Sequence, residues 1–227
     1  MPIEYEFTMN MVQISSELIE LLTWLDYDCP AAEREAAFQS LDTRVQSALD
    51  ELWEKYYARP KSNGRWSGEE CDSVWIPDDD YTPPNKHYQY NNLYNLNWGE
   101  LKKKYSIDGI AFCRGRVVFD NLAIHSIQIP DFAEFIDSNI RTGLHEEAFR
   151  RLAQKLGCSV KEIKELKEGQ PVDCSWQECD SMTHVNYAWH EDIDCETLYL
   201  VPQEIHGNII HFGGVAMCQL LRKHGLI

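Results

Sequence analysis

The stretch from Val185 to His206 restricts the fold more than any other part of the chain. Residues 185–190 include Val, Tyr and Trp, an acidic turn follows, and residues 197–201 are β-branched and apolar. Two such runs around a short polar turn are typical of paired antiparallel strands. Pro202 then fits the first position of a helix, where its missing N–H leaves no bond unmade. The stretch therefore predicts a strand, a turn, a second strand and a short helix.

Three histidines accompany this pattern: His190 on the first strand, His206 on the helix and His211 beyond it. Five residues along an ideal helix would turn His211 away from His206, so we expect the chain to break near residues 207–208. One-metal hydrolysis of a phosphodiester needs ligands from different elements and a separate base. Imidazole suits zinc, nickel or cobalt, and carboxylate suits magnesium or manganese. We therefore predict a site for one divalent metal ion (Zn, Ni, Mg or Mn).

The order of motifs in this region resembles a known family. Trp-His-Glu at 189–191, Leu-Val-Pro at 200–202, the two later histidines and Gly-Gly at 213–214 resemble the toxin nucleases of the HNH/endonuclease VII (His-Me finger) superfamily. The closest branch carries Trp-His-His or Trp-His-Glu at this point. The segments 64–68, 73–77 and 98–105 are similar to the lead-in of such modules, so the resemblance covers roughly residues 65–227.

The resemblance assigns roles to individual residues. It implies that His190, His206 and His211 ligate the metal. Glu191 stands where many members have a histidine that acts as general base, so it is the candidate catalytic residue beside His190. A carboxylate is a weaker base unless burial raises its pKa. Binding the metal as a fourth ligand, or orienting His190, is therefore the alternative role for Glu191.

Four further residues are expected to support the site. Thr197 stands where more typical members have an asparagine that braces the loop. Trp189 is expected to pack in the core beneath the site. Gly213 and Gly214 are expected to form a turn, with a phosphate cradle as the alternative.

The resemblance also implies a function. It points to a metal-dependent endonuclease that hydrolyses phosphodiester bonds in DNA and serves as a bacterial toxin or effector, neutralised by a cognate immunity protein. RNA is the alternative substrate. The alternative from another class is a catalytically inactive acidic scaffold that binds a basic protein partner. The toxin or effector is expected to be cytoplasmic as synthesised. Its delivery to other cells as a secreted effector is a further expectation.

The first part of the chain has a helical pattern of apolar residues. Residues 12–58 have apolar side chains at helical spacing, broken at Asp28-Cys29-Pro30, and predict an antiparallel helical hairpin. Residues 59–64 read as a linker. We thus expect an α+β protein with an N-terminal helical hairpin at 1–62, which would bind a protein or self-associate, and a nuclease domain at 65–227 containing a ββα-metal site.

The middle of the chain predicts shorter elements. The aromatic, Gly- and Pro-rich residues 65–84 indicate extended chain and turns. Helices are expected at 98–105, after Asp131, at 144–156 and from Ser159 to about 169, with capping boxes at the two named residues. A short strand is expected at 116–119, and loops at 85–97 and 170–183.

Charge and composition qualify these expectations. The net charge is −16, and residues 66–227 alone hold 25 acidic and 15 basic side chains, whereas proteins that hold DNA usually present lysine and arginine to phosphates. Lys102, Lys103 and Lys104 could contact phosphate or form a solvated helix face. No run of 18 apolar residues and no signal peptide is evident, so no membrane contact is expected.

The remaining cysteines and histidines are expected to be unremarkable. The eight cysteines favour a reduced protein, with a zinc site at Cys174, Cys179 and Cys195 as the minor alternative. The other histidines are interpreted as surface or satisfied core groups: His87, His125, His145, His184 and His224.

Overall fold

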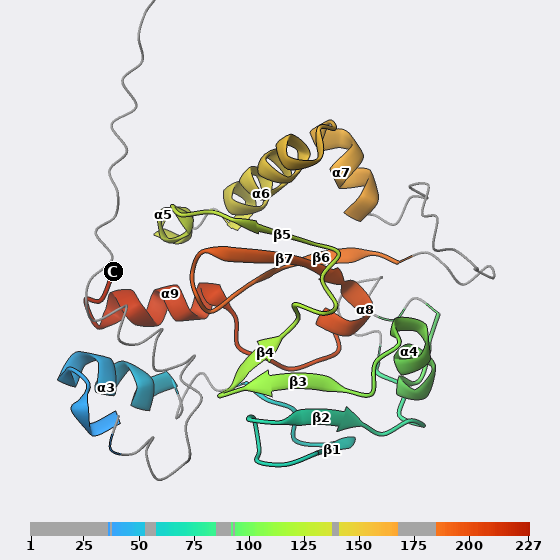
Figure 1. Cartoon of the computed structure of the whole chain (residues 1–227), viewed down its shortest axis with the longest axis horizontal. Coiled ribbons are helices and arrows are strands. Elements are labelled where there is room, and N and C mark those ends of the chain that lie inside the picture. The colour runs from blue at the N-terminus through green and yellow to red at the C-terminus, as the bar shows by residue number, and fades with distance from the viewer. Residues whose placement is uncertain are drawn as a thin grey trace, which may run out of the picture.

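The protein is a mixed α+β structure built around two small antiparallel sheets, as a computed structural model shows (Figure 1). The structure describes residues 36, 38–52, 58–84, 92, 94–137, 141–167 and 185–227. This confirms the α+β class expected from the sequence. The loop expected at 170–183, most of the loop expected at 85–97 and the first helix of the expected hairpin lie outside the described residues.

The first sheet contains four strands in the order β1-β2-β3-β4, each antiparallel to the next. The aromatic-rich segment that was expected to be extended forms β1 and β2, and its tryptophan Trp66 packs edge-on against Trp75 and Phe112 at centroid distances of 5.2 and 5.0 Å. These contacts explain how a segment rich in turns is held in place. The bounds are β1 Gly64–Trp66, β2 Val74–Pro77, β3 Ile110–Cys113 and β4 Arg116–Val118.

The second sheet contains three strands in the order β5-β7-β6. The two predicted strands are β6, Tyr187–Glu191, and β7, Thr197–Pro202, and they pair with His190 opposite Tyr199. The third strand, β5 at His125–Gln128, was not predicted. It pairs with β7 and places Ser126 opposite Tyr199.

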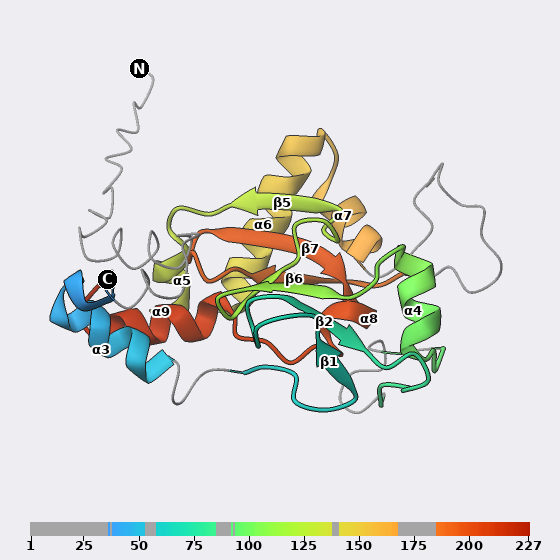
Figure 2. The same cartoon turned by 60° about the horizontal axis from the view of Figure 1, so that its bottom comes forward.

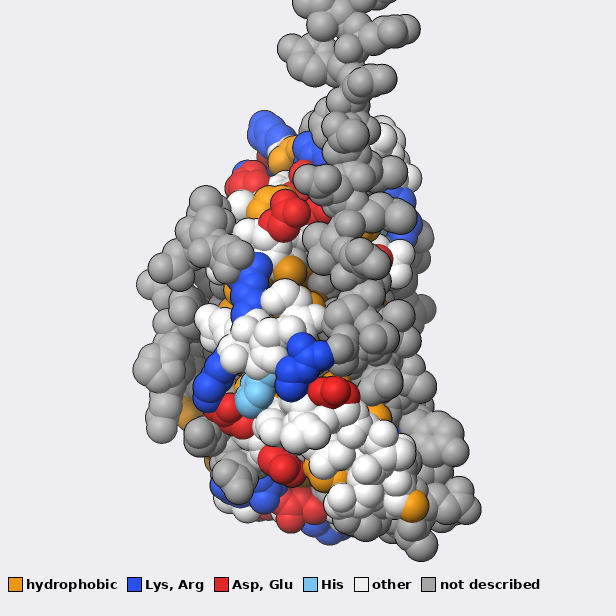
Figure 3. Space-filling view, turned by 90° about the vertical axis from the view of Figure 1, so that its left-hand side faces the viewer, with side chains coloured by type: hydrophobic (Ala, Val, Ile, Leu, Met, Phe, Trp, Pro, Cys, Tyr) orange, Lys and Arg blue, Asp and Glu red, His pale blue; other side chains and the backbone are white. Residues whose placement is uncertain are grey.

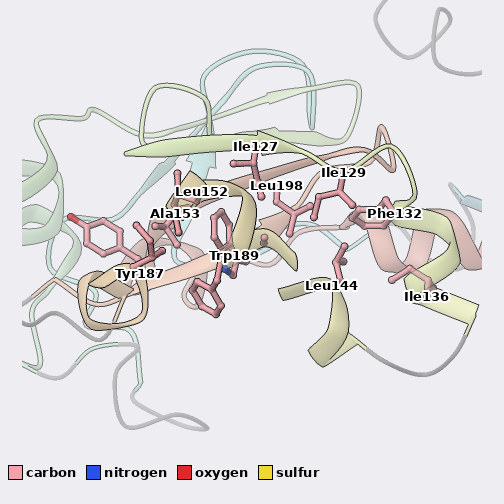
Figure 4. Close-up of a cluster of buried hydrophobic side chains, with 14 of the residues drawn as sticks. Ile127, Ile129, Phe132, Ile136, Leu144, Leu152, Ala153, Tyr187, Trp189 and Leu198 are labelled. Carbon is pink, nitrogen blue, oxygen red and sulfur yellow. The ribbon is translucent and has the colours of Figure 1, made fainter. Parts of the chain in front are cut away.

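Three helices cover one face of the second sheet (Figure 1). They are α5 Phe132–Asp137, α6 Arg141–Leu156 and α7 Val160–Lys167, and the predicted capping box at Ser159 is present: its N–H donates to Glu162, and its hydroxyl accepts from the Glu162 N–H. Figure 4 shows the core between helices and sheet, in which Trp189 and Leu198 lie among side chains from α6. Trp189 is 2% exposed, as expected for core packing.

The other face of this sheet packs against β3 and β4 of the four-stranded sheet, as Figures 1 and 2 show together. The helix predicted at 98–105 is present as α4, Trp98–Tyr105, and begins with a capping box between Asn97 and Glu100. The core on this side includes Phe119 and Val201. Residues of β7 therefore contribute to both cores, and β6 carries its functional side chains between them.

The described part of the N-terminal segment packs against the C-terminal helix. Helix α3 spans Thr43–Glu51 and α9 spans Gly214–Lys223. Leu49 lies in one buried cluster with Leu220 and Leu221. The apolar face expected to form the seam of a helical hairpin is thus covered, in its described part, by α9.

Two surface properties complete the fold. On the face shown in Figure 3, basic and acidic side chains are interspersed, without a large area of either charge among the coloured atoms. Among the described helices, none has the length and apolarity needed to cross a bilayer.

Candidate metal centre

The three predicted histidines converge at the junction of β6, β7 and α8. His190 lies on β6, His206 is the last residue of α8 (Gln203–His206), and His211 follows five residues later. One ring nitrogen of each histidine lies within 4.8 Å of the others, a grouping that can hold a metal ion. The sequence expectation that these three side chains meet agrees with this geometry.

A short helix that ends early brings His211 to the group. Pro202 is the N-cap of α8, whereas the sequence predicted it at the first helical position, one residue further into the helix. Gly207 is the C-cap. The chain therefore breaks at the predicted place, and Phe212 next forms a parallel β-bridge with Arg116 of β4. This bridge fixes the backbone beside His211.

The hydrogen bond of His211 determines which of its ring nitrogens carries the proton and which keeps a lone pair. Its Nδ1 lies 2.8 Å from the carbonyl oxygen of Ile209. Because a carbonyl only accepts, Nδ1 carries the proton and Nε2 keeps a lone pair. A backbone carbonyl on the far nitrogen is the usual arrangement for a metal-ligating histidine.

The ring of Phe119 packs against all three imidazoles. Its centroid lies 4.9 Å from that of His190, 5.8 Å from that of His206 and 5.4 Å from that of His211. Phe119 is buried and apolar, so it restricts the rings without offering them a hydrogen bond. His190 is also buried, whereas His206 and His211 are half-buried, so the group is closed on one side and open on the other.

His190 has an unsatisfied buried nitrogen. Its Nδ1 is shielded from water and has no hydrogen-bond partner among the described residues. Leaving such a group unpaired costs about 1–3 kcal/mol, so buried polar atoms normally have partners. A donor set of three imidazoles fits a metal ion.

The surroundings of His190 and His211 favour the neutral form of both rings. Burial lowers the pKa of His190 well below its ordinary value, and the neighbouring His211 and His206 lower it further. Burial also lowers the pKa of His211, against the opposing effect of its hydrogen bond to Ile209. Neutral imidazole is the form that binds a metal.

Glu191 is hydrogen-bonded to His145, which the sequence analysis interprets as a surface or satisfied core group. Its Oε1 lies 2.9 Å from Nε2 of His145 on α6, and the Glu191 side chain is buried. Consecutive residues of a strand point to opposite faces, so Glu191 faces α6 while His190 faces Phe119. Histidine spacing gives no signal for this pair, because α6 and β6 are distant in sequence.

Asp194 and Thr197 close the turn between β6 and β7. One oxygen of the Asp194 carboxylate accepts the backbone N–H of Thr197 at 2.7 Å, and the other accepts the Thr197 hydroxyl at 2.5 Å. Cys195 takes a left-handed conformation between them, with φ of 55°. Thr197 and Asp194 therefore hold this loop together through two hydrogen bonds.

Asp192, at the start of the same turn, forms a buried ion pair with Arg116. The guanidinium Nε and Nη2 donate to the two carboxylate oxygens at 2.9 and 2.5 Å. Burial raises the pKa of Asp192 to about 6, although Arg116 acts in the opposite direction. The pair connects β4 to the loop between β6 and β7.

The two glycines expected to form a turn begin α9, where Gly213 is the N-cap. A Cβ on Gly214 would lie 2.1 Å from the Asp192 carbonyl oxygen, and a Cβ on Gly213 would lie 3.3 Å from that of Glu191. The glycines thus allow α9 to approach the β6–β7 loop. This contact supports the structural interpretation over the phosphate cradle.

A second buried carboxylate fixes α8. Glu204 is 2% exposed, and its Oε2 accepts hydrogen bonds from Lys104 Nζ and the Tyr105 hydroxyl, both at 2.7 Å. Burial and the neighbouring Glu204 raise the pKa of Tyr105 well above its ordinary value. Lys104 is therefore engaged in holding the helix that carries His206, rather than exposed to solvent.

The other chemistry-bearing residues lie apart from the three histidines. His224 pairs with Glu51, and Lys102 pairs with Asp79. Cys195 contacts the backbone carbonyl of Gly214. Cys174, Cys179, His87 and His184 lie outside the described residues.

Comparison of this chain with models of protein families, with curated proteins and with solved structures finds no match.

Proposed function

We propose that this protein is a metal-dependent nuclease, with one divalent ion held by His190, His206 and His211. The observation that carries the proposal is the convergence of the three imidazoles within 4.8 Å, with the buried Nδ1 of His190 left unpaired. Three nitrogen ligands favour zinc or nickel over magnesium or manganese. Two half-buried ligands leave one side of the group open for a substrate oxygen, as in other catalytic metal sites.

The roles of the residues follow from their positions. When bound, the ion would stabilise negative charge on a phosphodiester and on its leaving oxygen. His211 is oriented by its bond to Ile209, and His206 by the anchored helix α8. Glu191 is the general base that the resemblance implies. Its carboxylate lies on the α6 side of β6, hydrogen-bonded to His145, and its charge acts on His190 and His211.

The resemblance of the Trp-His-Glu segment to toxin nucleases suggests the biological setting. We infer DNA as the substrate, with RNA second, and a role as a bacterial toxin or effector that a cognate immunity protein would neutralise. Synthesis in the cytoplasm and delivery to other cells would follow from that role.

The test combines metal analysis with a nuclease assay on the purified chain. We expect about one equivalent of zinc or nickel, cleavage of plasmid DNA that a chelator abolishes, and recovery of cleavage on adding metal back. H190A and H206A should lose both metal and cleavage while keeping the circular dichroism of the folded protein. Parallel digestion of transfer RNA separates DNase from RNase activity.

The negative net charge favours one second candidate, a non-catalytic scaffold that binds a basic protein. A net charge of −16 would attract a cationic partner and repel nucleic acid. A folded, metal-loaded protein that leaves both DNA and RNA intact would support this candidate and reject the nuclease.

A further inference from the structure

A cavity of about 440 Å³ lies at the edge of the three-stranded sheet. It is formed by β5, β7 and α6, and none of its lining residues is acidic. Two cations and the hydroxyl groups of Ser126 and Tyr199 line it, a combination that suits an anion, whereas the Thr197 hydroxyl donates to Asp194. The lining residues are Ser126, Ile127, Gln128, Arg151, Lys155, Thr197 and Tyr199.

The chemistry of this cavity differs from that of a second one of similar size. The other cavity, of about 470 Å³, is likewise lined by two cations, Lys102 and Lys103, but the carboxylates Asp79 and Asp108 line it as well. Lys102 there is already paired with Asp79. The cavity at β5 is therefore the better anion site of the two.

The cations at this cavity are held in position by the backbone of β5. Lys155 Nζ donates to the carbonyl of Ser126 at 3.0 Å, and Arg151 Nη1 donates to that of Gln128 at 3.1 Å. Arg151 also pairs through Nε with Glu147, whereas Lys155 has no carboxylate partner within the described residues. Each cation therefore keeps further donors after making its carbonyl bond.

A row of paired residues connects this cavity to the three histidines. His190 lies opposite Tyr199, and Tyr199 lies opposite Ser126, so the three side chains cross the sheet on one face. The rings of His190 and Tyr199 are stacked with centroids 6.5 Å apart. Two strand spacings separate His190 from Ser126, which is about 10 Å.

We propose that this cavity binds a phosphate of the same polynucleotide whose scissile bond lies at the histidines, about two or three nucleotides away. A nucleic-acid strand carries one phosphate per 3.4 Å of helix rise, so a phosphate falls within reach of Lys155 and Arg151. The inference rests on the proposed nuclease function and adds a flanking-phosphate subsite to it. Tyr199, between the two positions, offers a ring for an intervening base.

The test measures binding of labelled oligothymidylate by fluorescence anisotropy in the presence of a chelator, so that no cleavage occurs. For a ten-nucleotide strand, R151Q/K155Q should bind roughly three- to tenfold more weakly than the wild type and reduce the slope of log K against log salt by about one to two. For a two-nucleotide strand, the variant and the wild type should bind with nearly equal affinity. Millimolar inorganic phosphate should compete weakly, because a free phosphate lacks the linked contact at the histidines.

The control K61Q/K161Q removes the same charge from two exposed lysines elsewhere on the surface. Equal weakening by the control, or a loss in R151Q/K155Q that does not depend on strand length, would overturn the subsite. Strong competition by free phosphate would overturn the polynucleotide as the ligand. Length-dependent binding without any hydrolysis on adding metal would uphold the subsite and refute the nuclease function alone.

Discussion

Gly214 faces the carbonyl oxygen of Asp192 so closely that a Cβ would lie 2.1 Å from it. The neighbour is backbone, so G214A must push α9 away from the β6–β7 loop. We expect a loss of about 1–3 kcal/mol in the free energy of unfolding, measured in urea, together with weaker metal binding. G213A is the control, since its Cβ would lie 3.3 Å from the nearest atom and its φ of −128° suits alanine. Equal losses in the two variants would contradict this explanation.

Arg116 neutralises a carboxylate that is 1% exposed. R116A would leave Asp192 buried and unpaired, which in other proteins costs about 3–5 kcal/mol. We expect a loss near the lower value, because the Arg116 side chain is 24% exposed. R44A, which breaks the exposed pair with Asp42, should cost less than about 0.5 kcal/mol. Thermal and urea unfolding measure both, and a similar small loss in the two variants would refute the structural role.

The role of Glu191 can be separated from metal binding. If Glu191 is the base, E191Q should reduce kcat for DNA hydrolysis about 10²–10⁴-fold and leave the zinc affinity within about threefold of the wild type. E165Q, on the exposed face of α7, is the matched control. A parallel loss of zinc affinity in E191Q would instead identify Glu191 as the fourth ligand. H145Q, which keeps a hydrogen-bond donor, should lose less activity than H145L.

The stability of the metal-free protein should fall as pH decreases below about 6.5. The pKa values of His190 and His211 are lowered from 6.5 in the folded chain, so the unfolded chain binds protons first. The stabilisation is complete above pH 6.5 and is lost as pH falls, by up to about 1.4 kcal/mol per pH unit for each histidine. Urea unfolding between pH 8 and 5, with a chelator present, measures it.

The comparison with H190Q isolates this effect. Asp192, whose pKa is raised, changes stability in the opposite direction, but it is present in both proteins. The free energy of unfolding of H190Q should change less steeply with pH than that of the wild type. Identical slopes would show that His190 titrates alike in the folded and unfolded chains.

Helix α3 should stabilise the rest of the protein. L49A removes a fully buried side chain from the cluster with α9 and should cost about 2–5 kcal/mol in the main unfolding transition. L156A, at a position 44% exposed, is the control and should cost little. A separate early transition for L49A, with the main one unchanged, would show that the N-terminal segment folds independently.

The sequence predicted the strand–turn–strand–helix stretch and the meeting of its three histidines, because the determinants of both are local. Two apolar runs, an acidic turn and Pro202 lie within one continuous stretch, and the break at Gly207 follows from the position of His211. The capping box at Ser159 is likewise a short-range pattern. Such signals depend on neighbouring residues and can be interpreted without knowing the fold.

The parts that were missed depend on distant partners. Strand β5 is short and mixed in polarity, and it forms because β7 pairs with it. Arg116 and His145 meet Asp192 and Glu191 across 76 and 46 residues. No spacing rule connects such pairs, so their roles become visible only when the sheets and α6 are packed together.

The backbone bonds of Lys155 and Arg151 have a consequence for solubility. Strand β5 is one of the two outer strands of its sheet, and an uncovered edge is a template for a strand from another chain. The carbonyls of Ser126 and Gln128 accept from these two long cationic side chains, which also place positive charge along that edge. A neighbouring molecule would have to displace both before its own strand could add to the sheet, so the same residues that offer donors to an anion discourage edge-to-edge aggregation.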